Sequence, residues 1–278
     1  MHLEHGFYDQ LRLDGVAELL DQIEVESREP RFLRSPVLSQ FPGLEYAVTF
    51  RGTDMGTTAG RDIEGCRTRR RQVCRALSVP FDRLTAGRQV HGNQVRIVTG
   101  ELIGSGHHPT KPPIPNTDGL VTDEPNVPLM VLGADCGMVA IYDPVRHAVG
   151  LCHAGWRGTA AGIVEALIGS MVDAFGCRAT HMVAAISPCA RACCYEVGQV
   201  VVERIAVRFP DGAAIFDRRG GRTYLDLGGA IARQIRTMGV QPENIGDAAV
   251  CTICGTDFYS YRRDGPSTGH FASIASLR

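Results

Sequence analysis

Residues 129–159 read LMVLGADCGMVAIYDPVRHAVGLCHAGWRGT, a stretch that combines buried-strand patterns with reactive side chains. It contains three apolar runs of strand length: Leu129–Leu132, Met138–Tyr142 and Ala148–Cys152. Cys136 lies between the first two runs, and His153 directly follows the third, before a predicted helix. A thiol and an imidazole at the ends of buried strands are suited to a metal site, or to a nucleophile paired with its base.

Strand and helix patterns are mixed along the rest of the chain. Further strands are predicted at residues 45–50, 182–186, 248–252 and 271–274, and helices at 63–77, 159–175, 195–209 and 223–238. Thr159 is the predicted N-cap of the second helix. Because several strands follow one another directly, the sequence predicts a single α/β domain with a mixed β-sheet core flanked by helices, not a doubly wound fold. We expect this domain to span residues 32–278, after an N-terminal appendage of residues 1–31.

The composition excludes several classes of protein. The chain has 278 residues, 44% of them hydrophobic, and a formal net charge of −1, which argues against a dedicated binder of nucleic acid or of a membrane surface. The arginine run at positions 67, 69, 70 and 71 is interpreted as a solvated helix face. The chain has ten cysteines. Its first residues are polar, so we expect no secretory leader, and no apolar run is long enough to cross a membrane. We expect a cytoplasmic protein with mostly reduced thiols.

His91, Cys136 and His153 form the strongest candidate site. Each lies at a predicted strand end beside glycine or alanine, where a side chain can point into a cleft. One thiolate and two imidazoles are good zinc ligands, and three protein ligands leave a fourth position open for catalysis. Their spacing fits no short zinc motif, so a buried cysteine with two unrelated histidines remains an alternative interpretation.

The turn after His153 adds a candidate anion site. Small residues in HAGWRGT allow a ligand to approach the backbone, and a helix N-terminus favours negative charge. Arg157 is placed to bind the same anion, although a surface ion pair explains this arginine equally well. Asp135 is a candidate for orienting a ligand from behind the site.

Two other clusters are given structural interpretations. The pair His107 and His108 is interpreted as exposed and flexible, because no predicted element fixes it. Cysteines 189, 193 and 194, together with the C-x-x-C pair 251 and 254, suggest a second zinc. We interpret them as ordinary core thiols, because no second C-x-x-C pair occurs at zinc-finger spacing.

Motifs along most of the chain resemble one known family. They are QVHG at 89–92, TDGLVT at 117–122, ADC at 134–136, HAGWRGT at 153–159, CYEVG at 194–198, DL at 226–227, CT at 251–252 and FYSYRRDG at 258–265 with TG at 268–269. In this order they resemble the laccase-domain, or polyphenol-oxidase-like, family, which includes bacterial purine nucleoside phosphorylases and the peptidoglycan editing factor.

The resemblance implies a zinc enzyme acting on small molecules. It places the zinc on His91, Cys136 and His153, and it implies phosphorolysis of adenosine, inosine and methylthioadenosine, with some adenosine deamination. Arg51 and Arg157, with the N-terminus of the 159–175 helix, would hold phosphate. Older family naming reports copper-dependent phenol oxidation, but this sequence lacks the histidine clusters that a multicopper site needs. A monomer or homodimer is expected.

The sequence departs from the family pattern at several positions around the expected cleft. The loop over residues 51–56 is shortened, and Asp54 stands where asparagine is usual. The other departures are Gly137 and Met138 after ADC, Ser187 in place of glycine, and His270 in place of arginine. These changes leave the metal trio intact and bear on the choice of substrate.

We therefore predict a zinc-dependent purine nucleoside phosphorylase. Tyr195, Glu196 and Arg262 are further candidates for the cleft wall, with structural hydrogen bonding as the alternative. A second hypothesis makes Cys136 a nucleophile and His153 its base, in a hydrolase or amidase acting on a peptide or cell-wall precursor. A third is a non-enzymatic binding protein that has lost substrate contacts in the shortened loop.

Overall fold

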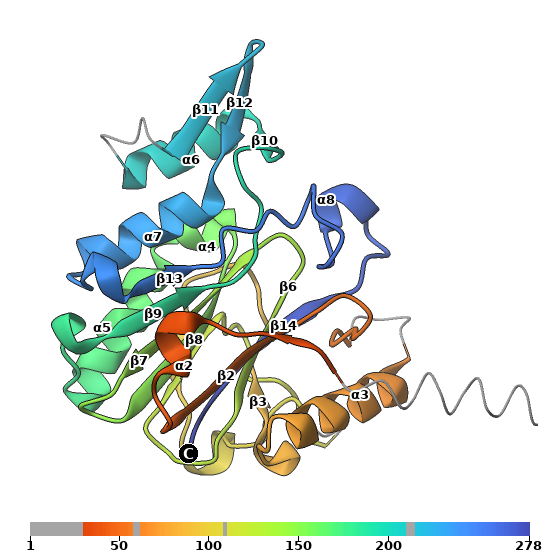
Figure 1. Ribbon diagram of the computed structural model, residues 1–278, viewed down its shortest axis with the longest axis vertical. Helices are drawn as coiled ribbons and strands as arrows, with labels where there is room; N and C mark the ends of the chain where they lie inside the picture. Colours follow the sequence, from red (N-terminus) through yellow and green to blue (C-terminus); the bar gives the residue numbers. More distant parts are fainter. Residues whose placement is uncertain (1–29, 58–61, 108–109, 210–214) are drawn as a thin grey trace, which may run out of the picture. The chain divides into compact units, whose positions relative to one another are not determined.

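The computed structural model describes residues 30–57, 62–107, 110–209 and 215–278. Two β-sheets in the body that begins at Arg31 pack face to face, with helices on the outer face of each (Figure 1). The first sheet has the order β1 (Phe32–Leu33), β2 (Leu44–Thr49), β14 (Phe271–Leu277), β6 (Leu129–Gly133) and β3 (Thr85–Ala86). The second has the order β13 (Ile245–Asp247), β9 (Val183–Ile186), β7 (Gly137–Asp143), β8 (Ala148–Ala154), β5 (Gly119–Thr122) and β4 (Val95–Ile97).

Alternation along the strands explains the layers. Met138, Ala140 and Tyr142 of β7 face the first sheet, whereas Val139 and Ile141 face the helices. Both faces of β7 are buried, so the strand reads as a continuous apolar run in the sequence. Each large apolar side chain buried in this way contributes about 1.5–3 kcal/mol.

Three of the described helices cover the outer faces of the large sheets. The described helices are α2 (Pro36–Ser39), α3 (Ile63–Ala76), α4 (Trp156–Ala161), α5 (Ile163–Phe175), α6 (Gln199–Arg208), α7 (Leu227–Thr237) and α8 (Tyr261–Asp264). Helices α5 and α7 pack on the six-stranded sheet, and α3 packs on the five-stranded sheet. Short 3-10 helices occur at Phe81–Arg83, Gly100–Leu102, Ala179–His181 and Pro242–Asn244.

A small sheet with the order β10 (Glu196–Val197), β12 (Arg222–Leu225) and β11 (Phe216–Arg219) is associated with α6 through a separate apolar cluster. The large sheets contain parallel and antiparallel neighbours. The prediction of an α/β domain with a mixed sheet, not doubly wound, is confirmed. Of the predicted N-terminal appendage, residues 1–29 lie outside the described part of the chain.

Several predicted elements differ from the observed ones. The helix predicted at 159–175 is two helices, because Gly162 takes a left-handed φ of +83° between them. Thr159 therefore lies inside α4 and caps nothing, and Gly155 is the N-cap. The predicted helix at 195–209 begins only at Gln199, after the short strand β10.

The C-terminal half contains two more differences. The helix predicted at 223–238 is β12 followed by α7, and Asp226 between them caps α7 by accepting a hydrogen bond from Gly229. The strand predicted at 248–252 forms earlier, as β13, where it pairs in parallel with β9. The pairing of β12 with β11 and β10, and of β13 with β9, decides where these strands begin and end.

In the arginine run of α3 only Arg71 is exposed, so the interpretation as a solvated face is wrong for the other three. Arg70 is only 3% exposed and donates hydrogen bonds to the carbonyl oxygens of Met55 and Gly106. Arg67 and Arg69 likewise donate to loop carbonyls, those of His107 and Asp54. The run therefore attaches the neighbouring loops to α3.

The interpretation of His107 as an exposed residue is also wrong. His107 is half-buried, hydrogen-bonds the carbonyl of Gly104 through Nδ1 and packs edge-on against Phe81 at 5.3 Å. His108 lies outside the described residues. Within the described ranges, no helix has the length and apolar character needed to cross a bilayer.

The buried thiols of α3 predict a loss of stability in alkali. Burial raises the pKa of Cys74 to about 12 and also raises that of Cys66. A thiol in the unfolded chain has a pKa of about 8.5. Burial of the neutral thiol therefore leaves the free energy of unfolding unaffected below that pH, and this free energy decreases as the pH rises above it. Each thiol should lower the unfolding free energy by about 1.4 kcal/mol per pH unit above this point. Urea unfolding at successive pH values, in reductant, measures the slope.

Cys74→Ala is the matched variant for this prediction. It removes one ionising thiol while the other buried thiols still titrate, so its stability should fall less steeply with pH than that of the wild type. Equal slopes for the two proteins would contradict the assignment.

Candidate metal centre

The six-stranded sheet brings His91, Cys136 and His153 to one end. Strands β7 and β8 are antiparallel, with Met138 opposite His153, so Cys136 directly before β7 lies beside the last residues of β8. Strands β4 and β5 begin at the same end, and His91 lies in the loop that leads into β4. Three distant parts of the sequence therefore meet because of the sheet register.

One sulfur and two ring nitrogens of this trio lie within 4.8 Å of one another. The two imidazole rings are nearly perpendicular, with centroids 4.9 Å apart. His153 is buried and Cys136 is half-buried, whereas His91 is exposed. The trio is thus open to solvent on the His91 side, where an additional ligand has access.

Asp118, to which the sequence reasoning gave no role of its own, orders the site from behind. It is 1% exposed, and its Oδ1 lies 3.0 Å from Nδ1 of His153. A carboxylate partner at Nδ1 favours the tautomer with a proton there, which leaves Nε2 available as a ligand atom. The TDG motif was visible in the sequence, but its contact with His153 depends on the pairing of β5 with β8.

The same carboxylate shapes the His91 loop. Asp118 accepts hydrogen bonds from the backbone N–H groups of Val90, His91 and Gly92 at 2.9–3.0 Å. His91 has a φ of +62°, a left-handed conformation that non-glycine residues adopt only when other contacts stabilise it. Asp118 therefore positions both histidines, one through its ring and the other through its backbone.

Gly155 is needed for the close approach of these groups. A Cβ atom at this position would lie 2.8 Å from Sγ of Cys136 and 3.3 Å from the His91 ring. Neither side chain can move away without separating the trio. Glycine thus keeps the turn after β8 compact enough for the cysteine and the first histidine to meet.

The electrostatics favour a thiolate at Cys136. Burial raises its pKa, but the neighbouring imidazoles of His153 and His91 outweigh this effect and bring the pKa of Cys136 down to about 6. Burial lowers the pKa of His153, whereas Cys136 and Asp118 raise it to about 9. The thiolate and imidazolium stabilise each other, and a bound cation would take the place of the imidazolium charge.

The donor set fits a zinc ion. Cysteine sulfur and histidine nitrogen are preferred zinc donors, and one histidine already has the carboxylate partner found behind many zinc ligands. Three donors with an opening to solvent correspond to a catalytic arrangement, not to a closed structural one. The role of the trio as ligands remains a prediction.

Asp135 links the site to the C-terminal loops. Its φ is +88°, its Oδ1 accepts a 2.6 Å hydrogen bond from Oγ1 of Thr252, and its Oδ2 accepts one of 2.6 Å from the backbone of Arg262. Both oxygens are therefore engaged with neighbouring loops. Asp135 fixes the walls of the site, and the structure shows no hydrogen bond from it to a metal-trio side chain.

The cleft wall carries exposed cations. Arg157 lies at the start of α4, stacks on Trp156 at 4.5 Å, and has no carboxylate partner among the residues that the structure describes. Burial, and to a smaller extent nearby Cys136, raise the pKa of Tyr195 to about 12, although Arg262 and Arg157 oppose the rise. Tyr195 is thus within electrostatic range of the thiol and of both arginines.

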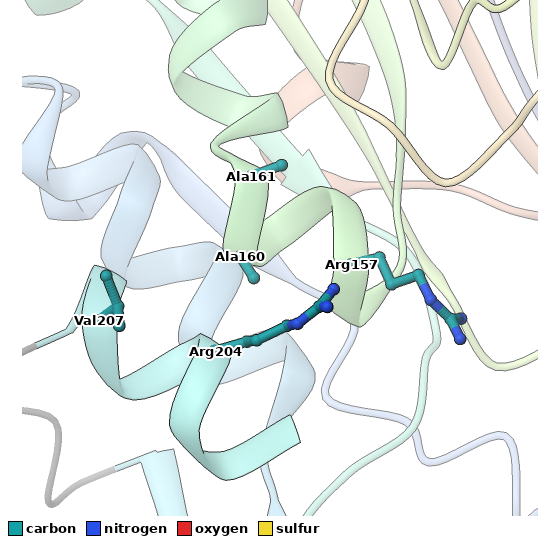
Figure 2. A pocket seen from close by; sticks show the side chains of 5 residues that line it. All are labelled: Arg157, Ala160, Ala161, Arg204 and Val207. Carbon is teal, nitrogen blue, oxygen red and sulfur yellow. The ribbon is translucent and has the colours of Figure 1, made fainter. Parts of the chain in front are cut away.

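A surface hollow beside α4 is separate from the trio. It lies between α4 and α6 and is lined by Arg157, Ala160, Ala161, Arg204 and Val207 (Figure 2). The Arg157 side chain extends from α4 away from Arg204. The hollow contains no residue of the metal trio, so the candidate site is the sheet end and not this hollow.

The other predicted residues are engaged elsewhere. Arg51 donates to Asp264 at 3.1 Å and lies over the ring of Tyr259. Arg262 donates to the backbone carbonyl of Glu196 at 2.8 Å. The Glu196 carboxylate pairs with an arginine of β12 on the surface. Arg51, Arg262 and Glu196 are therefore all paired with other protein groups.

The comparison with known families decides the assignment. Residues 43–278 match the family described as multi-copper polyphenol oxidoreductase laccase. The chain belongs to this family. Its relatives include proteins named purine nucleoside phosphorylase, among them YlmD of Geobacillus stearothermophilus, which is 32% identical over 239 residues, covering 85% of this chain and 87% of that one. A relative with the same enzyme name in Deinococcus radiodurans is 33% identical, covering 88% and 92% of the two chains.

Solved structures of the family share the fold. The crystal structure of YlmD from Geobacillus stearothermophilus has a TM-score of 0.84 at 30% identity, covering 91% of this chain and 97% of that one. Protein NMB0706 of Neisseria meningitidis has a TM-score of 0.76 at 27% identity, covering 90% and 99%.

The departures from the family pattern occur in contacting pairs. Asp54 accepts hydrogen bonds through Oδ1 from the backbone N–H groups of Gly56 and His270, at 3.0 and 2.9 Å. Oγ of Ser187 accepts a 3.0 Å hydrogen bond from the backbone of Met138. Asp54 and His270, and likewise Ser187 and Met138, are thus neighbours joined through backbone N–H groups.

Proposed function

We propose that this chain is a zinc-dependent purine nucleoside phosphorylase, with the metal at His91, Cys136 and His153. The observation that carries the proposal is the convergence of one thiol and two imidazoles, ordered by Asp118, beside an open cationic wall. The enzyme names of family members with high coverage support the same activity. Phosphate and a purine nucleoside would be the substrates, and a free purine base and ribose 1-phosphate the products.

In this proposal the side chains bind and orient the reactants. Arg157, without a carboxylate partner in the described residues, offers a planar guanidinium to a phosphate oxygen. Arg51 is a second cation for phosphate, although Asp264 already shares its charge. A phosphate oxygen would attack C1′ of the ribose while the bond to the purine nitrogen breaks. The two-turn helix α4 is too short to add a strong dipole, so the arginines carry the anion binding.

A bound zinc would supply Lewis-acid polarisation of a substrate oxygen at this opening. Asp118 would keep the ring of His153 oriented and its tautomer fixed. Copper oxidation of phenols is not part of the proposal, because the two metal-capable clusters in the described residues contain only two histidines.

A substrate panel tests the function. Adenosine, inosine and methylthioadenosine are incubated with the protein in the presence and absence of phosphate. The free base, inosine and the sugar phosphate are quantified, the latter being ribose 1-phosphate from adenosine and inosine and methylthioribose 1-phosphate from methylthioadenosine. We expect ribose 1-phosphate to form only with phosphate. Inosine formed from adenosine without phosphate would report deamination at the same site. No turnover of any nucleoside by zinc-loaded protein would contradict the proposal.

Arg157→Gln is expected to weaken phosphate use. Loss of a charge-assisted hydrogen bond of about 1.5–3 kcal/mol should raise the KM for phosphate about 10- to 150-fold, with a smaller change in the KM for nucleoside. Steady-state kinetics with varied phosphate measure it. Arg204→Gln is the matched control, because this exposed arginine lies on the other side of the hollow in Figure 2. An equal effect of both variants would contradict a specific role of Arg157.

A second candidate function follows from the same geometry. Cys136, His153 and Asp118 lie in the order of a nucleophile, its base and the residue that orients the base. This arrangement suits a hydrolase or amidase. Iodoacetamide labelling in metal-free protein separates the two functions: turnover that survives metal removal and is abolished by alkylation of Cys136 favours the nucleophile.

A further inference from the structure

A second cluster of thiols lies at the same end of the six-stranded sheet as the trio. Strands β9 and β13 are parallel neighbours, and the loops that follow them carry Cys193 and Cys194 on one side and Cys251 and Cys254 on the other. An isolated parallel bridge between Cys189 and Cys251 continues the pairing beyond the strands. The sheet therefore aligns an adjacent cysteine pair with a C-x-x-C pair.

The sulfur positions suit one tetrahedral ion. All four sulfur atoms lie within 4.8 Å of one another, and those of Cys193 and Cys254 are 3.8 Å apart. Four sulfurs around one zinc at about 2.3 Å are separated by roughly 3.8 Å in a tetrahedron. The N–H group of Cys194 donates a 3.0 Å hydrogen bond to the carbonyl of Arg191, which closes a turn. In this turn the side chains of Cys193 and Cys194 both reach the centre of the cluster.

The interpretation of these residues as core thiols is wrong for two of them. Cys193 and Cys254 are exposed and Cys194 is half-buried, whereas Cys189 and Cys251 are buried. Ordinary apolar packing does not explain why exposed thiols converge. The sequence suggests a second zinc here, but the core-thiol interpretation was preferred because zinc-finger patterns contain two separated pairs.

We propose that Cys193, Cys194, Cys251 and Cys254 bind one zinc ion in a closed structural site. Four cysteine ligands in tetrahedral arrangement are typical of structural zinc and leave no position for substrate. The proposal is independent of the function proposed for the trio, since it concerns another set of ligands.

Hydrogen-bond donors lie around the cluster. The sulfur of Cys251 receives hydrogen bonds from the backbone N–H groups of Ile253 and Cys254 within its own loop. Arg219 donates to the carbonyl of Cys193 at 2.6 Å, and Arg263 donates to the carbonyl of Thr252 at 2.7 Å. Two guanidinium groups therefore lie on the ligand loops, and each also pairs with an aspartate, Arg219 with Asp217 and Arg263 with Asp264.

The proposed ion would brace the wall of the candidate metal centre. Thr252, between the two cysteines of the C-x-x-C pair, donates the 2.6 Å hydrogen bond to Asp135, the residue before Cys136. The Ala190 N–H on the partner loop donates to the Asp135 carbonyl at 2.8 Å. Joining the two loops through zinc fixes both contacts with Asp135.

Metal analysis of single-site variants tests the proposal. The full chain is purified under reducing conditions without added metal and analysed by inductively coupled plasma mass spectrometry. We expect about two zinc ions per wild-type chain and one in Cys254→Ser, with none in the double variant Cys136→Ala with Cys254→Ser. Cys177→Ser, a buried cysteine outside both clusters, is the matched control and should keep both ions.

Cobalt substitution provides a second readout that does not depend on activity. In Cys136→Ala, which lacks the first site, Co²⁺ should give the intense visible and thiolate charge-transfer bands of a tetrahedral four-sulfur site. These bands should disappear when Cys193→Ser is added, while circular dichroism verifies that the variant is folded.

Three results would overturn the proposal. The first is an unchanged zinc content in folded Cys254→Ser, and the second is iron in place of zinc at the cluster. The third is a disulfide between Cys193 and Cys254 that persists in protein purified under reducing conditions, detected by thiol titration. Loss of nucleoside turnover alone bears on the trio and not on this cluster, so the two proposals fail separately.

Discussion

Cys136→Ala is expected to remove one zinc ion per chain and to lower turnover by about 10³-fold or more. The variant deletes the only sulfur of the trio and leaves two imidazoles, one of them exposed. Two ligands hold zinc far less well than three, and the Lewis-acid contribution that is lost amounts to several kcal/mol of transition-state stabilisation. Metal analysis and ribose 1-phosphate assays on the same preparation measure both effects.

The outcome of this substitution separates the hypotheses. Cys177→Ser should keep both zinc content and turnover, because Cys177 lies in neither cluster. A Cys136→Ala protein that turns over nucleosides at the wild-type rate would refute the assignment of the trio. Loss of activity with zinc retained at the trio would instead favour the cysteine nucleophile.

Asp118→Asn is expected to weaken zinc binding at the trio about 10- to 100-fold, the usual effect of losing the partner behind a metal ligand. The carboxylate accepts four hydrogen bonds, from three backbone N–H groups and the His153 ring. An amide has one oxygen, and its NH2 group would face a donor. Each unsatisfied buried donor costs about 1–3 kcal/mol, so the melting temperature should fall as well. Competition with a chromogenic chelator measures affinity, and calorimetry measures stability.

Asp123→Asn is the matched control, since Asp123 is an exposed aspartate just beyond β5. It should change neither the zinc affinity nor the melting temperature appreciably. If Asp118→Asn binds zinc as tightly as the wild type, Asp118 has only a structural role in the His91 loop.

Local patterns in the sequence were sufficient for the centre of the fold. The three apolar runs after Leu129 became β6, β7 and β8 with small changes at their ends. They were recognisable because strands buried on both faces are continuously apolar. The segment at 63–77 became α3 for a comparable reason, with Asp62 as its cap.

Elsewhere, contacts with distant residues determined the outcome. The helical spacing of Val197 and Val201 does not reveal that Glu196 and Val197 pair with β12. From the sequence, the segment around Gly162 could form one long helix or two. The left-handed conformation of Gly162 in the folded chain divides it into α4 and α5. Arg70 reads as a surface charge until the carbonyls that surround it are known.

The sequence by itself determined the kind of domain, the family and the three residues offered as metal ligands, because these depend on residue types and on patterns within short stretches. Only the tertiary structure decided that Asp118 orders both histidines, and that four cysteines from two loops share one centre. Hydrogen-bond partners and ligand sets are fixed by which strands pair and in which register, and pairings between distant segments leave no local pattern in the chain.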